Sequence, residues 1–185
     1  TSMDRVVAIK LIKVEDVGDP EMAERFKTEV RAAAQLEHAN IVRAYDAHLD
    51  GEPLYLVMEL IDGFDLHSLV SRKGPLPVEQ AVHFIRQAAL GLKHAHEKGM
   101  VHRDVKPHNL MVTRKGQVKI LDFGLAKLTG GPKAGTGQTR LGMMMWTPDY
   151  LAPEQSTNAR GVDVRADVYS LGCTLFHMLT GRPPF

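Results

Sequence analysis

The sequence predicts an α+β fold in which a strand-rich first third precedes a mainly helical remainder. Three segments of the first third are β-branched or alternate between apolar and polar residues, which indicates strands. Two of them, 41–49 and 53–60, are joined through Asp50-Gly51, a dipeptide typical of hairpins between antiparallel strands. Two later segments, 77–98 and 163–180, show the apolar content and length of helices.

Composition and charge restrict the function classes. The chain has 185 residues, 44% hydrophobic and 24% charged, which suits a globular protein with a substantial core. Its net charge of +1 gives no case for nucleic acid or an anionic membrane as the main partner. Cys173 is the single cysteine, so we expect a buried filler and no internal disulfide. With no apolar run long enough to span a bilayer, we expect a cytoplasmic protein or the cytosolic domain of a membrane-anchored parent.

The first predicted strand covers 5–13, contains the run Val7-Ala-Ile-Lys10, and is followed by a helix. Asp19 is the expected N-cap of this helix and Pro20 its first residue. Glu29 lies in mid-helix beside the apolar stripe, whereas the other glutamates are more simply explained as solvated charges. The stripe recurs at helical spacing and consists of Met22, Phe26, Val30 and Ala33.

The segment 77–98 is predicted as an amphipathic helix that stops at Gly99. Within it, His94 and His96 are two residues apart and therefore lie on different faces, so we predict no metal pair there. Two short strands, 110–112 and 117–121, are expected before the last helix. The apolar stripe of the 77–98 helix is predicted to comprise Val78, Ala81, Val82, Ile85, Ala88, Ala89 and Leu92.

Two polar motifs separate these helices and indicate chemistry. The first is His102-Arg-Asp104-Val-Lys106-Pro-His-Asn109, and the second is Asp122-Phe-Gly124. Together they resemble the catalytic loop and the metal-binding segment of protein kinases, in which in-line phosphoryl transfer needs one carboxylate at the acceptor hydroxyl and hard oxygen ligands for magnesium. The first motif alone could be an Arg-Asp pair at the surface of a loop. With both motifs at the offsets expected in that family, the probability of a chance match is below about one in a hundred.

These motifs, with Val7-Ala-Ile-Lys10 before them and Ala152-Pro-Glu154 after them, resemble those of protein kinases. Lys106 after Asp104 resembles the serine/threonine branch of the family. Glu154 followed by Gln155, and the run 167–172, resemble its bacterial members of the eukaryotic (Hanks) type. The resemblance implies a protein-kinase-like two-lobe fold. A partial small lobe with an antiparallel sheet is expected over 1–60, and a partial, mainly helical large lobe over 61–185.

The resemblance also implies a role for each site residue. Asp104 would orient the acceptor hydroxyl, with Lys106 and Thr147 beside it, while Asn109 and Asp122 would bind Mg²⁺. Lys10, paired with Glu29, would contact the nucleotide phosphates. Adenine would be surrounded by Ala8, Met58, Glu59 and Met111, although Met58 is equally well explained as a core filler. The residues expected to order the catalytic loop and the segment after it are His102, Arg103, Phe123, Gly124, Glu154 and Asp167.

The implied activity is transfer of the ATP γ-phosphate to serine or threonine hydroxyls of protein substrates. A second possibility is a pseudokinase that serves as a binding scaffold, but the presence of Lys10, Asp104, Asn109 and Asp122 together argues against it. A third is a kinase of small molecules. The segment 147–154, which resembles the peptide-docking platform of protein kinases, argues against that alternative.

The resemblance further predicts that this sequence is a fragment of a kinase domain. The Gly-rich loop expected before the lysine strand and the last large-lobe helices are missing from it. In the family, one of those helices supplies the Arg that pairs with Glu154. Trp146 stands where the family usually has Gly, next to the docking platform. We expect the fragment alone to be inactive or nearly so.

Thr139 is predicted as the activating phosphosite. An Arg such as Arg103, adjacent to the catalytic Asp, usually binds a phosphate on the activation segment, and a phosphate can order a mobile loop. Of the other threonines in that segment, Thr129 and Thr136 lie farther from the docking platform, and Thr147 is assigned to the acceptor site. The alternative is that Thr139 is a solvated loop residue.

Overall fold

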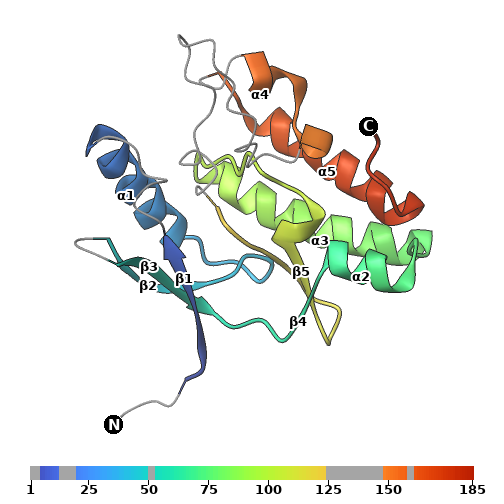
Figure 1. Ribbon diagram of the computed structural model, residues 1–185, viewed down its shortest axis with the longest axis horizontal. Coiled ribbons are helices and arrows are strands. Elements are labelled where there is room, and N and C mark those ends of the chain that lie inside the picture. Colours follow the sequence, from blue (N-terminus) through green and yellow to red (C-terminus); the bar gives the residue numbers. More distant parts are fainter. Residues whose placement is uncertain (1–4, 13–19, 50–52, 124–147, 158–160) are drawn as a thin grey trace.

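The structure is a computed structural model with two three-stranded antiparallel sheets and five α-helices in its described part. Figure 1 shows the first sheet and helix α1 at one end of the molecule, and the longer helices α3 and α5 at the other. The described residues are 5–12, 20–49, 53–123, 148–157 and 161–185.

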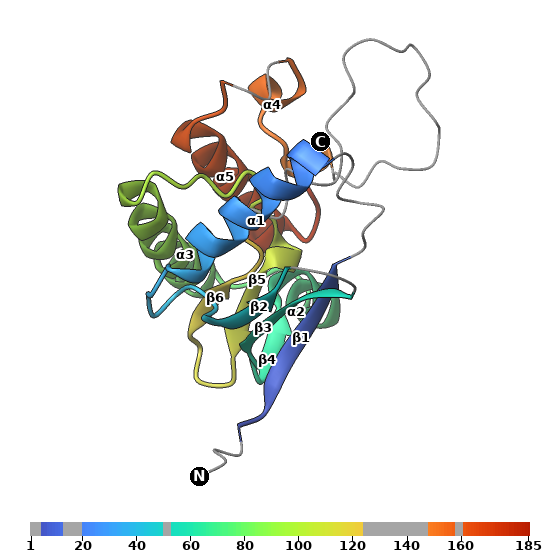
Figure 2. The same ribbon diagram turned by 90° about the vertical axis from the view of Figure 1, so that its left-hand side faces the viewer.

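The first sheet has the strand order β1-β3-β2 and agrees with the strands predicted from the sequence. β3 (Leu54–Glu59) is central and pairs antiparallel with β1 (Val7–Ile12) and with β2 (Ala44–His48). Helix α1 (Pro20–Ala34) starts at the predicted proline and contacts β2, as the side view in Figure 2 also shows. The apolar cluster between helix and sheet is centred on Val30 and Leu49.

The second sheet has the strand order β4-β5-β6, and the catalytic loop, residues 102–109, leads directly into its strand β5. β5 (Leu110–Thr113) and β6 (Val118–Ile120) match predicted strands, but β4 (Gly63–Asp65) and helix α2 (Leu66–Lys73) were not foreseen. Both elements are short and give little periodic signal in the sequence. Asp65 caps α2, because its carboxylate accepts from the Ser68 backbone N–H at 2.8 Å. Gly63 is needed because a Cβ there would overlap the Val112 carbonyl.

Helices α3 (Val78–Glu97) and α5 (Val164–Thr180) pack against each other and form the body of the helical part. Both were predicted, and α5 begins after Asp163, whose carboxylate accepts from the Arg165 N–H at 2.9 Å. It ends at Gly181, which has a left-handed φ of 79°. Between them lie two 3₁₀ turns, Pro107–Asn109 and Pro148–Tyr150, and the short helix α4 (Pro153–Thr157).

The predicted apolar stripe of α3 was wrong in part. Val78 and Val82 are 65% and 50% exposed, and Ala89 is also exposed. The buried face is rotated from the predicted one and includes Gly91, where a Cβ would lie 2.7 Å from Ile120 Cδ1 and 3.0 Å from the Asn40 carbonyl oxygen, so this close contact favours glycine. The residues that α3 buries are Ala81, Phe84, Ala88, Gly91, Leu92 and Ala95.

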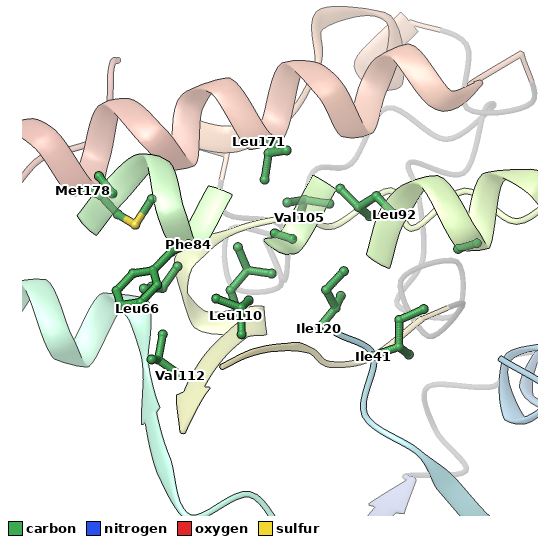
Figure 3. Close-up of a cluster of buried hydrophobic side chains, with 14 of the residues drawn as sticks. Ile41, Leu66, Phe84, Leu92, Val105, Leu110, Val112, Ile120, Leu171 and Met178 are labelled. Atoms are coloured by element: carbon green, nitrogen blue, oxygen red, sulfur yellow. The ribbon is translucent and has the colours of Figure 1, made fainter. Parts of the chain in front are cut away.

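The main core lies between α3, α5 and the second sheet. Figure 3 shows Phe84, Leu92 and Leu110 pointing into it, with Leu171 and Met178 entering from α5. Ile41, which follows α1 in the chain, belongs to the same core and bridges to Ile120 of β6. The segment after α1 is therefore packed on the helical part and not on the first sheet alone.

A buried amide pair joins that segment to the helical part. The side-chain N–H₂ of Asn40 donates to Gln87 Oε1 of α3 at 3.1 Å and to the Val118 carbonyl of β6 at 2.9 Å. Gln87 Oε1 also accepts from the Val118 N–H at 3.0 Å. These bonds satisfy polar groups at the junction and set the position of β6, which leads directly to Asp122.

Two predictions on composition can also be compared with the structure. Cys173 is buried, as expected, and burial raises the pKa of its thiol, which is typical of an inert structural cysteine. Within the residues that the structure describes, each helix is too short or too polar to cross a bilayer.

Candidate functional site

The catalytic loop, residues 102–109, is attached to α5 through one buried carboxylate. Asp167 is 0% exposed, and its two oxygens accept from the backbone N–H groups of His102 at 2.8 Å and Arg103 at 2.7 Å. The family resemblance predicted that Asp167 helps to order this loop, and these two bonds are the contacts through which it does so. His96 Nε2 also lies 2.8 Å from Asp167 Oδ2. A buried carboxylate needs such partners, because an unpaired charge in the interior is costly.

Arg103 forms the turn of the loop and has a positive φ of 67°. This left-handed conformation is unfavourable for a side chain with a Cβ, so surrounding contacts must maintain it. On its N–H side the contact is Asp167. On its carbonyl side it is the side-chain amide of Gln155, 2.8 Å away.

His102 orders the loop from within and is 1% exposed. Its Nδ1 accepts from the Asp104 N–H at 3.2 Å, so Nε2 carries the proton and donates to the Leu121 carbonyl at 2.7 Å. Its ring meets the edge of Phe123 with centroids 4.7 Å apart. The two polar motifs of the sequence are therefore in direct contact.

Asp104 lies at the surface of this loop between a cation and an amide. Lys106 Nζ is 2.9 Å from Asp104 Oδ2, and Asn109 Nδ2 donates to that same oxygen at 2.9 Å and to the Asp104 carbonyl at 2.8 Å. Since these described contacts converge on Oδ2, Oδ1 is the oxygen available to an approaching hydroxyl. The side chain of Asp104 is 25% exposed and thus accessible.

Asn109 and Asp122 fit the donor set of a magnesium site. Both N–H groups of the Asn109 amide are directed to Asp104, so its carbonyl oxygen is the atom free to coordinate a cation. Asp122 has a positive φ of 63° and follows β6. Both offer hard oxygen ligands, which Mg²⁺ prefers. In the described ranges there is no cluster of three or more His, Cys, Asp or Glu side chains suited to a metal, so the nucleotide phosphates and water would complete the shell.

Lys10 extends from β1 to the same place. Its Nζ lies 2.6 Å from Asp122 Oδ2, and the two side chains are 39% and 26% exposed. Glu29, the predicted partner of Lys10, lies within α1, but its side chain is outside the described part of the structure. Among the described side chains, Lys10 therefore pairs with Asp122.

Of the residues predicted around adenine, Ala8, Met58 and Glu59 lie on the paired strands β1 and β3, and Met111 lies on β5 of the second sheet. Ala8 is the direct strand partner of Met58, and Met58 borders a small cavity of about 40 Å³ that extends to Phe123. Glu59 turns its carboxylate to Lys119 Nζ at 2.9 Å, so only its backbone could contact a nucleotide. Met111 lies on β5 opposite Lys119 and is partly exposed.

Several predicted residues lie outside the described part. These are Gly124, Thr139, Trp146 and Thr147. Glu154 is described, lies exposed on α4, and contributes to the raised pKa of Arg165, for which the Asp163 carboxylate is the main cause.

Sequence reasoning missed a polar cluster beneath the loop. The rings of His67 and His108 stack with centroids 4.1 Å apart, and His67 also contacts His177 of α5. His177 Nδ1 lies 2.9 Å from the Tyr150 hydroxyl. Burial raises the pKa of Tyr150 to about 12 and lowers that of His177. Isolated histidines at these spacings give no sequence signal, because the contacts join segments far apart in the chain.

Comparison with known proteins agrees with this geometry. The model of the protein kinase domain matches residues 1–185. The chain is 42% identical to the serine/threonine-protein kinase PknB of Mycobacterium leprae, covering 99% of this chain and 29% of that protein. It is 40% identical to PknL of Mycobacterium bovis, covering 99% and 45%. The chain thus spans less than a third of its PknB relative and less than half of PknL.

A solved structure gives the same result for the fold. The crystal structure of the Mycobacterium tuberculosis PknI kinase domain superposes with a TM-score of 0.78 at 29% sequence identity. The match covers 99% of this chain and 67% of that one. The chain therefore belongs to the protein kinase family, in its bacterial serine/threonine branch.

Proposed function

We propose that this chain is the catalytic part of an ATP- and Mg²⁺-dependent kinase that phosphorylates serine and threonine residues of proteins. The observation that supports this most directly is the geometry of Asp104, which receives Lys106 and Asn109 on one carboxylate oxygen and keeps the other accessible. A scaffold without catalysis has no need for that arrangement. In this proposal, residues 1–60 belong to the small lobe and 61–185 to the large lobe.

Asp104 orients the acceptor hydroxyl and takes its proton as the new P–O bond forms and the bond from the γ-phosphorus to the departing ADP breaks. Such a positioned base contributes about 10²–10⁴ to the rate. Lys106, 2.9 Å away, offsets the negative charge that gathers as the hydroxyl approaches phosphate. The family resemblance implies that Lys106 and Thr147, the latter outside the described residues, crowd the acceptor site, so we expect it to accept a short serine or threonine side chain rather than a tyrosine ring.

Asn109 and Asp122 would hold Mg²⁺, which neutralises phosphate charge when bound. Lys10 is 2.6 Å from Asp122 and, as a flexible ammonium, exchanges that carboxylate for the α and β phosphates when nucleotide enters. Ala8, Met58, Met111 and the backbone of Glu59 enclose the adenine. Glu29 pairs with Lys10 in the nucleotide-bound form.

Arg103 supports regulation by phosphate. Its Nε is buried and has no hydrogen-bond partner among the described residues, which suits a guanidinium that receives an anion in another state. We assign that anion to a phosphate on Thr139.

The kinase domain would work on the cytosolic side of the membrane, in keeping with a single, reduced cysteine.

The test is a phosphotransfer assay with the full-length protein that contains this chain, generic protein substrates, small alcohols and Mg-ATP. Phosphoserine and phosphothreonine as products, lost in Asp104→Asn, are expected. Transfer only to small alcohols would identify a small-molecule kinase instead. Nucleotide binding without any transfer would favour the scaffold. Phosphotyrosine as the main product would contradict the acceptor assignment.

A further inference from the structure

Gln155 joins two parts of the site that the sequence does not connect. It lies in the first turn of α4, directly after the Ala152-Pro-Glu154 motif, and Figure 1 shows α4 near the start of α5. Its Oε1 accepts from the Ala152 N–H at 3.1 Å. Its Nε2 donates to the Arg103 carbonyl at 2.8 Å, across 52 residues of sequence.

The first of these bonds is a helix cap. A Gln or Glu at the third helical position commonly reaches back to the N–H of the residue preceding the helix, here Ala152. Because an amide has one acceptor and one donor end, capping with Oε1 turns the N–H₂ end towards Arg103. The cap therefore fixes the direction of the second bond.

The second bond acts on a strained turn. Arg103 has a φ of 67°, and its N–H is already bonded to the buried Asp167. Gln155 binds the carbonyl of that same residue, so the peptide group linking Arg103 to Asp104 is constrained from the side opposite Asp167. A rotation of this peptide would move the Asp104 backbone and, with it, the carboxylate.

We propose that Gln155 is a positioning residue that aligns the catalytic loop with the peptide-docking segment. This inference rests on the proposed kinase function, because its purpose is to place Asp104 relative to an acceptor bound along residues 148–154. Gln155 does not touch the reacting atoms. It couples Ala152, at the end of the docking segment, to the residue before Asp104 through two hydrogen bonds from one rigid amide.

The substitution Gln155→Glu removes the bond to the Arg103 carbonyl and keeps the cap on the Ala152 N–H. Glutamate has the same size and caps a helix from this position as well as glutamine does, but its carboxylate cannot donate to the Arg103 carbonyl. Gln80→Glu is the matched control, because Gln80 is also the third residue of a helix, α3, and is exposed. Both variants are made in the full-length protein.

We expect Gln155→Glu to lower kcat by about tenfold or more, with KM for ATP and the thermal midpoint close to wild type, because a lost hydrogen bond misplaces the base. Gln80→Glu should match the wild type. A kcat of Gln155→Glu within twofold of wild type would overturn the proposal. If Gln155→Glu does not fold, Gln155→Met takes its place, since it has similar size and no charge, with the same criterion.

A second measurement distinguishes a failure of this proposal from a failure of the proposed kinase function. Wild-type protein without phosphotransfer would refute the kinase function and leave Gln155 to be judged by amide hydrogen exchange. Exchange at Asp104 and Val105 should be about tenfold faster in Gln155→Glu than in Gln80→Glu if Gln155 orders the loop. Equal exchange in the two variants would overturn the positioning role whatever the activity.

Discussion

The loop of residues 102–109, which we propose is catalytic, and the strand β1, which carries Lys10, are built differently. The loop is anchored by buried polar groups, with Asp167 0%, His102 1% and Asn109 8% exposed. β1 instead carries Lys10, whose side chain is 39% exposed. Lys10 is described with one ion pair, to Asp122.

The difference suits the two regions to different tasks: the loop is preorganised, whereas Lys10 can exchange its ion-pair partner. A network of satisfied, buried hydrogen bonds holds one geometry, which suits the role of base that we propose for Asp104. A partly exposed ion pair between flexible groups is worth little and is readily replaced, which suits the transfer of Lys10 from a carboxylate to phosphate that we propose.

The largest effect is expected from changing the base at the centre of the ordered loop. In the full-length protein, Asp104→Asn keeps the side-chain shape but cannot accept the hydroxyl proton, so turnover should fall about 10²–10⁴-fold. Mg-ATP affinity should stay near wild type, because Asn109 and Asp122 remain. Steady-state kinetics with calorimetry measures both. Near-normal turnover in this variant would contradict the role of Asp104.

The next effect concerns the stability of the loop anchor. Asp167→Asn places an N–H₂ group against buried N–H donors of His102 and Arg103, so the free energy of unfolding should fall by about 3 kcal/mol. Urea unfolding measures this change. Asp62→Asn is the control, because Asp62 pairs with Arg114 at the surface with both side chains more than three-quarters exposed. An equal, small change in both variants would show that the anchor is not stabilising.

The lysine strand should respond in the opposite way. Lys10→Met removes an ion pair whose members are 39% and 26% exposed, so stability should change by less than about 1 kcal/mol. Mg-ATP affinity should nevertheless fall by about tenfold, while adenosine affinity stays constant, because the lost contact is to phosphate. Calorimetry with both ligands checks this. Equal losses for the two ligands would refute a phosphate role.

The same contrast explains what the sequence could predict. Motif residues such as Asp104, Asn109 and Asp122 are recognisable because their chemistry requires particular residue types at set offsets. Long helices were predicted because their periodicity extends over many residues. The short β4 and α2 were missed because three and eight residues give little periodic signal. The buried face of α3 was misassigned because packing against Ile120 selected Gly91, which carries no hydrophobic signal.

Contacts between distant segments were beyond prediction. Gln155 binds Arg103, and Glu59 pairs with Lys119, through side chains that are unremarkable in the sequence. His96 was considered only as a metal ligand, whereas in the fold it approaches Asp167. In each case the partner is at least 52 residues away, so only the tertiary fold brings the groups together.

The smallest expected effect is a pH dependence of the helical part. His177 is 4% exposed, lies 2.9 Å from the Tyr150 hydroxyl, and faces His67, with His108 beyond it. Burial and, secondarily, these two histidines lower its pKa below the usual 6.5. The unfolded chain then binds a proton at higher pH than the folded chain does. Stability should therefore be constant above about pH 6.5 and decline as the pH falls towards the lowered pKa of His177.

The substitution His177→Gln tests this origin, because glutamine can bond Tyr150 but does not titrate. Its stability should decline less than that of the wild type between pH 7 and pH 5, as measured by urea unfolding at each pH. His48→Gln is the control, because His48 is exposed on β2 and stacks only on Tyr55 among the described rings. That variant should follow the wild-type curve. If His177→Gln follows it too, the acid sensitivity comes from other groups, and the buried histidine beneath the catalytic loop is a neutral packing residue at every pH tested.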